Sequence, residues 1–187
     1  MFKELLLKDR SIRRFKQDVV IERSVLEELV DLGRISASGA NLQPLKYMLS
    51  CDAETNAMIF PHLRWAGYLT EWDGPAEGER PAAYIIVLGD TEISKNFGVD
   101  HGIASHSILL GAADKGIGGC MVGSLNRAGL AEALEIPTRY EVLLVLAMGI
   151  PAETVKLSES VDSIKYYRNE ADVHIVPKRS RSEVILN

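Results

Sequence analysis

The chain has 187 residues, 47% of them hydrophobic and 25% charged, with a formal net charge of −5 at pH 7. This length suits one domain with a sizeable core, and the acidic balance excludes a broadly basic nucleic-acid-binding surface. Two cysteines, Cys51 and Cys120, are too few for a disulfide scaffold. The apolar runs at residues 5–7 and 142–152 are too short for a signal peptide or a membrane span, so we expect a cytoplasmic protein.

The first third of the chain predicts two helices and a strand. Residues 3–9 favour a short helix. Ser24 and Glu27 have the spacing of a capping box, and apolar residues at helical spacing extend the second helix to about Ile35. The strand is predicted at residues 47–50.

Residues 54–81 are mixed in character, rich in aromatic and acidic residues, proline and glycine. They favour a lid or an excursion from the core. Trp65, Tyr68 and Trp72 are spaced by three and four, as on one helical face. Core packing is the usual role of such a face, and the alternative is stacking on a flat substrate.

The rest of the chain continues to alternate strands and helices. Strands are predicted at 83–88, 120–122 and 141–148, and helices at 101–115 and 126–134, the last capped by Asn126. The helix at 101–115 is apolar around most of its circumference, which indicates a buried, central helix. The spacing is not that of regular βαβ units, so we expect one α+β domain. The amphipathic, fragmented tail at 152–187 favours packing on a partner subunit.

Two short motifs suggest a ligand. Residues 10–14 hold Arg10, Ser11, Arg13 and Arg14, and forked guanidinium groups beside a hydroxyl suit a phosphate. Their alternative role is a solvated charged turn. Residues 38–44, Ser-Gly-Ala-Asn-Leu-Gln-Pro, form a small polar loop whose glycine lets the backbone approach a flat ligand. Their alternative role is a plain helix stop.

Other chemistries lack support in the sequence. Residues 116–119, Gly-Ile-Gly-Gly, follow a helix rather than a strand and lack the third glycine of a dinucleotide fingerprint. No pair of histidines has helical metal-ligand spacing, and we expect no metal site. A Gly-x-Ser-x-Gly elbow is absent.

The order of these motifs resembles the nitroreductase family of FMN-dependent oxidoreductases. The resemblance covers nearly the whole chain, from the arginine motif through the Ser-Gly-Ala-Asn-x-Gln-Pro loop and the Met-Val-Gly-Ser strand end at 121–124 to the basic tail. It implies an α+β fold with a central, mainly antiparallel sheet flanked by helices. It also implies a homodimer that exchanges its C-terminal tails and holds FMN at the interface.

The resemblance assigns roles by position. Arg10 and Ser11 would hold the FMN phosphate, with Arg13 near the pyrimidine edge of the flavin or its ribityl chain. Ser38, Gly39 and Asn41 would come from the other subunit, and Gly123 and Ser124 would offer backbone N–H groups near flavin N5. Lys178 and Arg179 would complete the phosphate site, a role for which Arg181 competes. Trp65, Tyr68 and Trp72 remain the substrate-contacting candidates on the ground of their aromatic spacing, not of the resemblance.

One position departs from the family pattern. Relatives often have two basic residues before the serine, and the first is Asp9 here. A carboxylate pointing at a phosphate would be repulsive. We expect its side chain to point away, with Arg14 or the tail compensating.

The implied activity is hydride transfer from NADH or NADPH through flavin N5 to a small acceptor, such as a nitroaromatic or a quinone, by a ping-pong scheme. The flavin carries the chemistry, so no catalytic side chain is expected. The alternatives are a non-enzymatic flavin-binding or sensor protein, and another flavin reaction on the same scaffold, either flavin fragmentation or reductive dehalogenation.

Overall fold

The computed structural model describes residues 2–159 and 162–187, so residues 160 and 161 of the predicted tail lie outside the described residues. A four-stranded antiparallel sheet has the order β1-β2-β4-β3. Its strands are β1 (Leu45–Ser50), β2 (Ala83–Asp90), β4 (Tyr140–Gly149) and β3 (Gly118–Val122). The prediction of an α+β fold around a mainly antiparallel sheet is confirmed.

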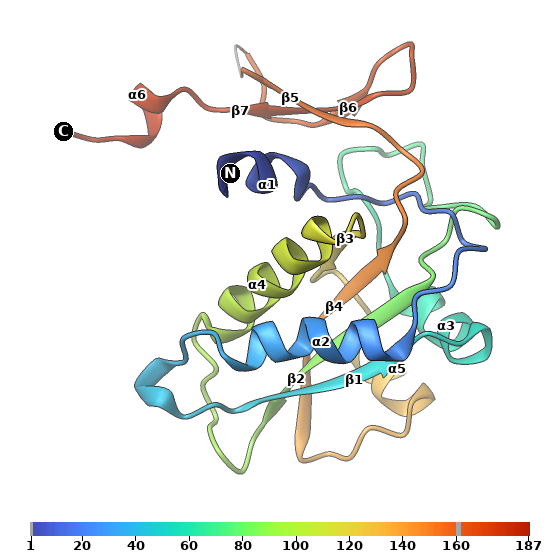
Figure 1. Cartoon of the computed structure of the whole chain (residues 1–187), viewed down its shortest axis with the longest axis vertical. Coiled ribbons are helices and arrows are strands. Elements are labelled where there is room, and N and C mark those ends of the chain that lie inside the picture. The colour runs from blue at the N-terminus through green and yellow to red at the C-terminus, as the bar shows by residue number, and fades with distance from the viewer. Residues whose placement is uncertain (1, 160–161) are drawn as a thin grey trace.

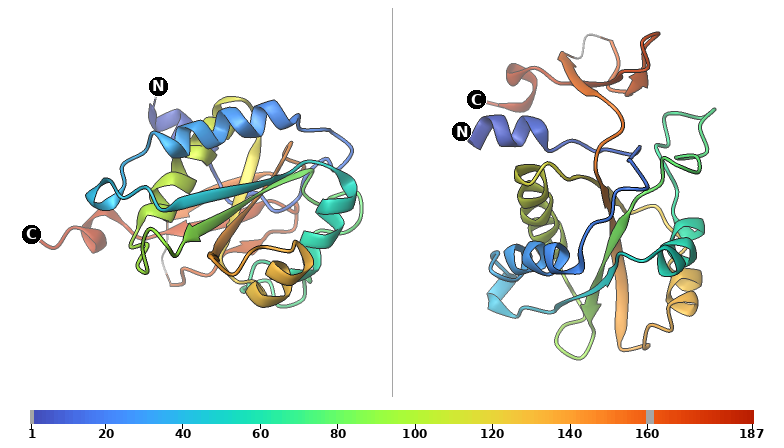
Figure 2. Two further views of the ribbon diagram at one scale, coloured as in Figure 1. Left: turned by 90° about the horizontal axis from the view of Figure 1, so that it is seen from below. Right: turned by 45° about the vertical axis from the view of Figure 1, so that its right-hand side comes forward.

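Both faces of the sheet are covered by helices. These are α2 (Arg23–Arg34) and α4 (Asp100–Asp114) on one face, and α3 (Ala53–Ile59) and α5 (Arg127–Ala133) on the other (Figure 2). The continuous apolar run of β2 follows from this layering, because successive side chains point to opposite faces. Ile85 and Val87 belong to the core under α2 and α4, while Tyr84 and Ile86 belong to the core under α3 and α5.

The predicted capping box at the start of α2 is wrong. The N-cap is Glu22, which makes no side-chain capping bond to a described residue, and Ser24 lies inside the first turn. Hydrophobic packing instead determines where α2 begins. With Glu22 as N-cap, the N′ and N4 positions are Ile21 and Leu26, both buried in one core cluster, as in a hydrophobic staple. Asn126, in contrast, caps α5 as predicted, by accepting a hydrogen bond from the Gly129 N–H.

The helical face predicted for Trp65, Tyr68 and Trp72 is also wrong. The chain leaves α3 through a 3-10 turn, η2 (Phe60–His62), and residues 64–82 are turns, bends and coil. Gly74, at φ +120°, lies so close to Trp65 that a Cβ would sit 2.5 Å from the indole Cδ1. The loop is therefore folded on its own tryptophan, while Tyr68 is 48% exposed. The lid hypothesis now concerns residues 64–81, because α3 packs Ile59 into the core.

Helix α4 buries one side rather than its whole circumference. Ala104, Ile108 and Ala112 are buried, whereas Ile103 is 39% exposed. Its predicted bounds are otherwise confirmed, and Gly116, at φ +77°, ends it in a left-handed conformation.

The N-terminal helix and the C-terminal segment lie together at one end of the molecule (Figure 1). These elements are α1 (Phe2–Lys8), β5 (Val155–Glu159), β6 (Tyr167–Arg168), β7 (His174–Lys178) and α6 (Arg181–Val184). The three strands form a second sheet of order β5-β7-β6. The last residues project away from the body, with Val184 63% and Leu186 96% exposed.

Candidate functional site

The arginine motif is held in an extended conformation along β3. The Ile12 N–H donates to the Gly119 carbonyl over 3.0 Å, and Ser11 pairs with Gly119 in an isolated parallel bridge. Ile12 and Phe15 are buried and fix the segment to the core. The charged residues between them therefore have a defined place rather than that of a free surface turn.

Arg10 has only part of its guanidinium group hydrogen-bonded. Its Nη2 donates to the Leu6 carbonyl of α1 over 2.7 Å, while its buried Nε has no hydrogen-bond partner in residues 2–159 and 162–187. Neighbouring Asp9 points toward α4, where its carboxylate lies 3.4 Å from Nδ1 of His106. Burial raises the pKa of Asp9, and the charges of His106 and Arg10 oppose that shift.

Arg13 and Arg14 have different surroundings. The Arg13 guanidinium lies 5.0 Å from the centre of the Tyr166 ring, and its Nη1 is 3.4 Å from His174 Nε2. Desolvation, and then the charges of Arg13 and Arg168, lower the pKa of fully buried His174 to about 4. The imidazole is therefore neutral at pH 7 and adds no second positive charge beside Arg13.

Arg14 is neutralised within the chain. It forms ion pairs with Asp172 and with Glu79, the latter over 3.3 Å, and its guanidinium lies 5.8 Å from the Trp72 ring. Arg14 therefore does not compensate for Asp9.

The Ser38–Gln43 loop is strained and anchored. It contains the 3-10 turn η1 (Gly39–Asn41), and Ala40, Asn41 and Gln43 have φ of 49°, 55° and 52°. Non-glycine residues rarely adopt such angles, and they gather at functional sites. The Asp100 carboxylate holds the loop by accepting hydrogen bonds from the Ser38 hydroxyl over 2.6 Å and from the Gly39 N–H over 2.9 Å.

Helix α4 separates this loop from the arginine motif within one chain. The loop contacts α4 at Asp100, whereas Asp9 contacts it at His106. Six residues of helix correspond to about 9 Å along its axis. One copy of the chain therefore does not bring the two motifs together at α4.

The other predicted residues lie at strand ends. Gly123 follows β3, and a Cβ there would meet no described atom within 4 Å. The carbonyls of Gly123 and Ser124 accept hydrogen bonds from Arg127 and from the Arg64 N–H. Lys178 ends β7, and neither it nor Arg179 forms an ion pair within the described ranges.

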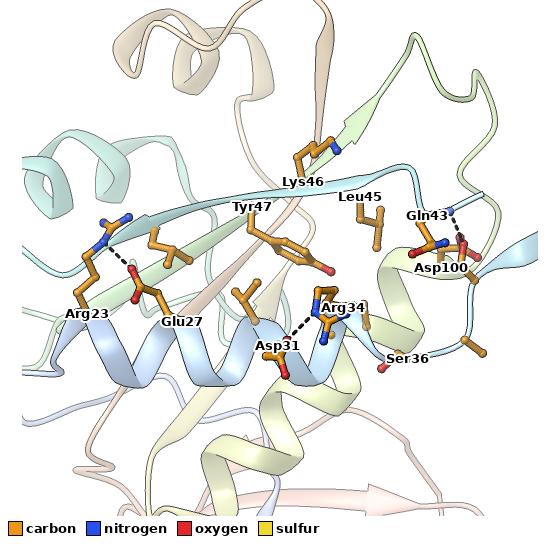
Figure 3. Close-up of a pocket in the computed structure, with 16 residues that line it drawn as sticks. Arg23, Glu27, Asp31, Arg34, Ser36, Gln43, Leu45, Lys46, Tyr47 and Asp100 are labelled. Carbon is orange, nitrogen blue, oxygen red and sulfur yellow. Dashed lines mark hydrogen bonds and ion pairs between the residues drawn. The ribbon is translucent and has the colours of Figure 1, made fainter. Parts of the chain in front are cut away.

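A groove of about 610 Å³ lies between α2 and β1, with Gln43 and Asp100 at one end (Figure 3), and Ser38 is also among the residues that line it. Ion pairs along α2, Arg23–Glu27 and Asp31–Arg34, form its rim. Desolvation raises the pKa of Tyr47, in the wall of this groove, to about 12. The arginine motif does not line it.

The sequence-based interpretation missed Glu153, Asp100 and His174. Asp100 directly precedes the helix predicted at 101–115, which is a weak signal for an anchor. Glu153 and His174 lie in the tail, where no motif points to their partners in the arginine segment.

Both cysteines are free. In the part of the chain that the structure describes, no group of three or more His, Cys, Asp or Glu is arranged to hold a metal.

The residues present fit FMN in their donor chemistry. Within the described ranges, Arg10, Arg13, Lys178 and Arg179 carry positive charge without an ion-pair partner, and the buried Nε of Arg10 is an unused donor. Forked donors of this kind suit a phosphate. The open space at Gly123 allows a planar ring to approach the backbone.

Comparison with known proteins gives the family. The nitroreductase family model matches residues 7–150, so the chain belongs to the nitroreductase family. A family protein from Clostridium difficile 630 is 22% identical with a TM-score of 0.69, covering 100% of this chain and 97% of that one. One from Clostridium novyi NT is 25% identical with a TM-score of 0.65, covering 81% and 86%.

A protein from Exiguobacterium sibiricum 255-15, solved in complex with FMN, is 18% identical with a TM-score of 0.68, covering 82% of this chain and 89% of that one. No match was found among the curated proteins. Of the helices in the described ranges, none combines the length and apolarity that crossing a bilayer requires.

Proposed function

We propose that this protein is an FMN-dependent oxidoreductase that uses NADH or NADPH to reduce a small planar acceptor, such as a nitroaromatic or a quinone. The observation that carries the proposal is the unpaired Arg10–Arg13 motif, fixed along β3 by buried Ile12 and Phe15. Family membership and a relative solved with FMN support it.

The residues have distinct tasks in this proposal. Arg10 and Ser11, completed by Lys178 and Arg179, hold the phosphate of FMN. When bound, FMN supplies the chemistry of accepting and donating a hydride. The fixed charge of Arg13 stabilises negative charge that develops at the pyrimidine edge of the ring. Gly123 and Ser124 present backbone N–H groups to the ring, and the exposed Tyr68 contacts the acceptor.

The proposal includes a homodimer. The Ser38–Gln43 loop meets α4 about two turns away from the contact of Asp9, so a site using both motifs needs the loop of a second copy. The exposed residues Val184 and Leu186 give the projecting tail an apolar surface to bury against that copy.

The direct test is a visible absorption spectrum of the purified protein, followed by anaerobic addition of NADH and then of NADPH. We expect a flavin spectrum that bleaches with one or both. A colourless protein that also fails to take up added FMN would refute the proposal. A flavin spectrum that stays oxidised would instead favour the second candidate, a non-enzymatic flavin-binding protein.

A further inference from the structure

One buried carboxylate meets the arginine motif from the far end of the sequence. The Glu153 side chain is 1% exposed. Its Oε1 accepts hydrogen bonds from the backbone N–H groups of both Arg13 and Arg14. Its Oε2 forms an ion pair with Arg168 over 2.9 Å. Both oxygens are thus committed to the motif and to the tail.

The contact with the backbone sets the geometry of the motif. A single charged acceptor that binds two successive N–H groups fixes the peptide between them, and charge-assisted bonds are the stronger kind. The segment after Arg14 is also held on this side, because the Ala152 N–H donates to the Arg14 carbonyl over 2.9 Å. The direction in which Arg13 leaves the backbone therefore depends on residues 152 and 153.

The contact with Arg168 removes the electrostatic cost of this carboxylate. A bare negative charge beside a phosphate site would weaken anion binding. Arg168 is only 13% exposed, and it also approaches Asp172 over 3.4 Å. Its guanidinium lies 5.0 Å from the ring of Trp72, in the loop that the sequence predicts as a lid. The Glu153–Arg168 pair thus connects the motif, the tail and that loop.

We infer that Glu153 is a positioning residue of the proposed cofactor site: it fixes the backbone of Arg13 and Arg14 so that Arg10 and Arg13 face the cofactor, while Arg168 balances its charge. The inference rests on the proposed function. It adds that the affinity for FMN depends on a side chain that does not itself touch the cofactor.

The test compares FMN affinity with stability in two variants. Glu153→Gln keeps an oxygen for the backbone N–H groups but loses the charge and turns an amide toward Arg168. The matched control is Asp90→Asn, since Asp90 is a fully buried carboxylate paired with Arg139 over 2.6 Å at the opposite end of the sheet. Apoprotein is titrated with FMN by quenching of flavin fluorescence, and its melting temperature is measured separately.

We expect both variants to melt at a lower temperature and only Glu153→Gln to lose FMN affinity, by about ten-fold, as for one charge-assisted bond. Glu153→Asp, which keeps the charge on a shorter side chain, should restore part of the affinity. It also replaces Glu153→Gln in the titration if that variant does not fold.

Two outcomes would overturn the inference, and they are distinguishable. Wild-type apoprotein that binds no FMN refutes the proposed function and the inference with it. Wild-type protein that binds FMN, with Kd values for the Glu153 variants within two-fold of wild type, leaves the proposed function intact. That second result would show that Glu153 has only a structural role, as the partner of Arg168 in an ion pair.

Discussion

Replacing Asp100 by alanine should release the strained Ser38–Gln43 loop. The change removes two charge-assisted hydrogen bonds, from the Ser38 hydroxyl and the Gly39 N–H, at a carboxylate only 7% exposed. Each bond is worth about 1.5–3 kcal/mol. The loop stores strain of about 1–2 kcal/mol in each of its three left-handed residues. The summed energy of the two hydrogen bonds is similar to the summed backbone strain. Without the two bonds, we therefore expect the loop to relax to an unstrained conformation.

Relaxation returns part of the lost energy, so we expect the free energy of unfolding to fall by about 1–3 kcal/mol in urea titrations. Amide hydrogen exchange should accelerate at residues 38–43. Asp100→Asn retains an acceptor and should lie between Asp100→Ala and wild type. Asp114→Ala, at the exposed far end of the same helix, should be neutral. If Asp100→Ala changes neither unfolding nor exchange at the loop, the anchoring argument is refuted.

Three further predictions concern single side chains. Arg13→Ala should weaken FMN binding, whereas Arg23→Ala, on the rim of the α2 groove, should not; equal Kd values in a titration would count against the assignment of Arg13. His174 has its pKa lowered to about 4 by the fold, so the unfolded chain binds more protons between about pH 4 and 6.5. Stability should therefore fall as pH is lowered through that window, by up to about 3 kcal/mol, and His174→Gln should flatten this part of the pH profile of urea unfolding. Gly89→Ala should destabilise by about 1–3 kcal/mol, because its Cβ would lie 2.3 Å from the buried Phe97 ring, and an unchanged melting temperature would show that the ring moves freely.

The sheet and most helices could be predicted because local pattern and tertiary structure agree there. The apolar run at 83–88 is buried on both faces, as a central strand requires. Asn126 caps its helix because the side chain reaches an N–H only three residues ahead. Such features depend on neighbours in sequence.

The same motif gives opposite results at two places in the chain. Ser24-Val-Leu-Glu27 has the capping-box spacing but does not cap, because burying Ile21 and Leu26 places the N-cap at Glu22, two residues earlier. Ser180-Arg-Ser-Glu183 forms a complete capping box in α6. No buried apolar pair competes at that exposed helix, so local hydrogen bonds decide.

The prediction of a helical face for the aromatic residues of the loop was wrong for a related reason. The spacing of Trp65, Tyr68 and Trp72 satisfies a helical period, but Gly74 in a left-handed conformation closes the chain on Trp65. Residue spacing carries no information on this contact, because it depends on the backbone angle of a glycine nine residues away.

The candidate site shows the same limit at longer range. The sequence shows a cluster of arginines but not which of them are already neutralised. Arg14 is paired with Glu79 and Asp172, far along the chain, whereas neither Arg10 nor Arg13 forms an ion pair with a described residue. The carboxylates near the motif thus bind Arg14 and the backbone, and not the guanidinium groups of Arg10 and Arg13. Glu153 takes the backbone of the motif and leaves the guanidinium groups of Arg10 and Arg13 available, which is the arrangement that an anionic ligand requires.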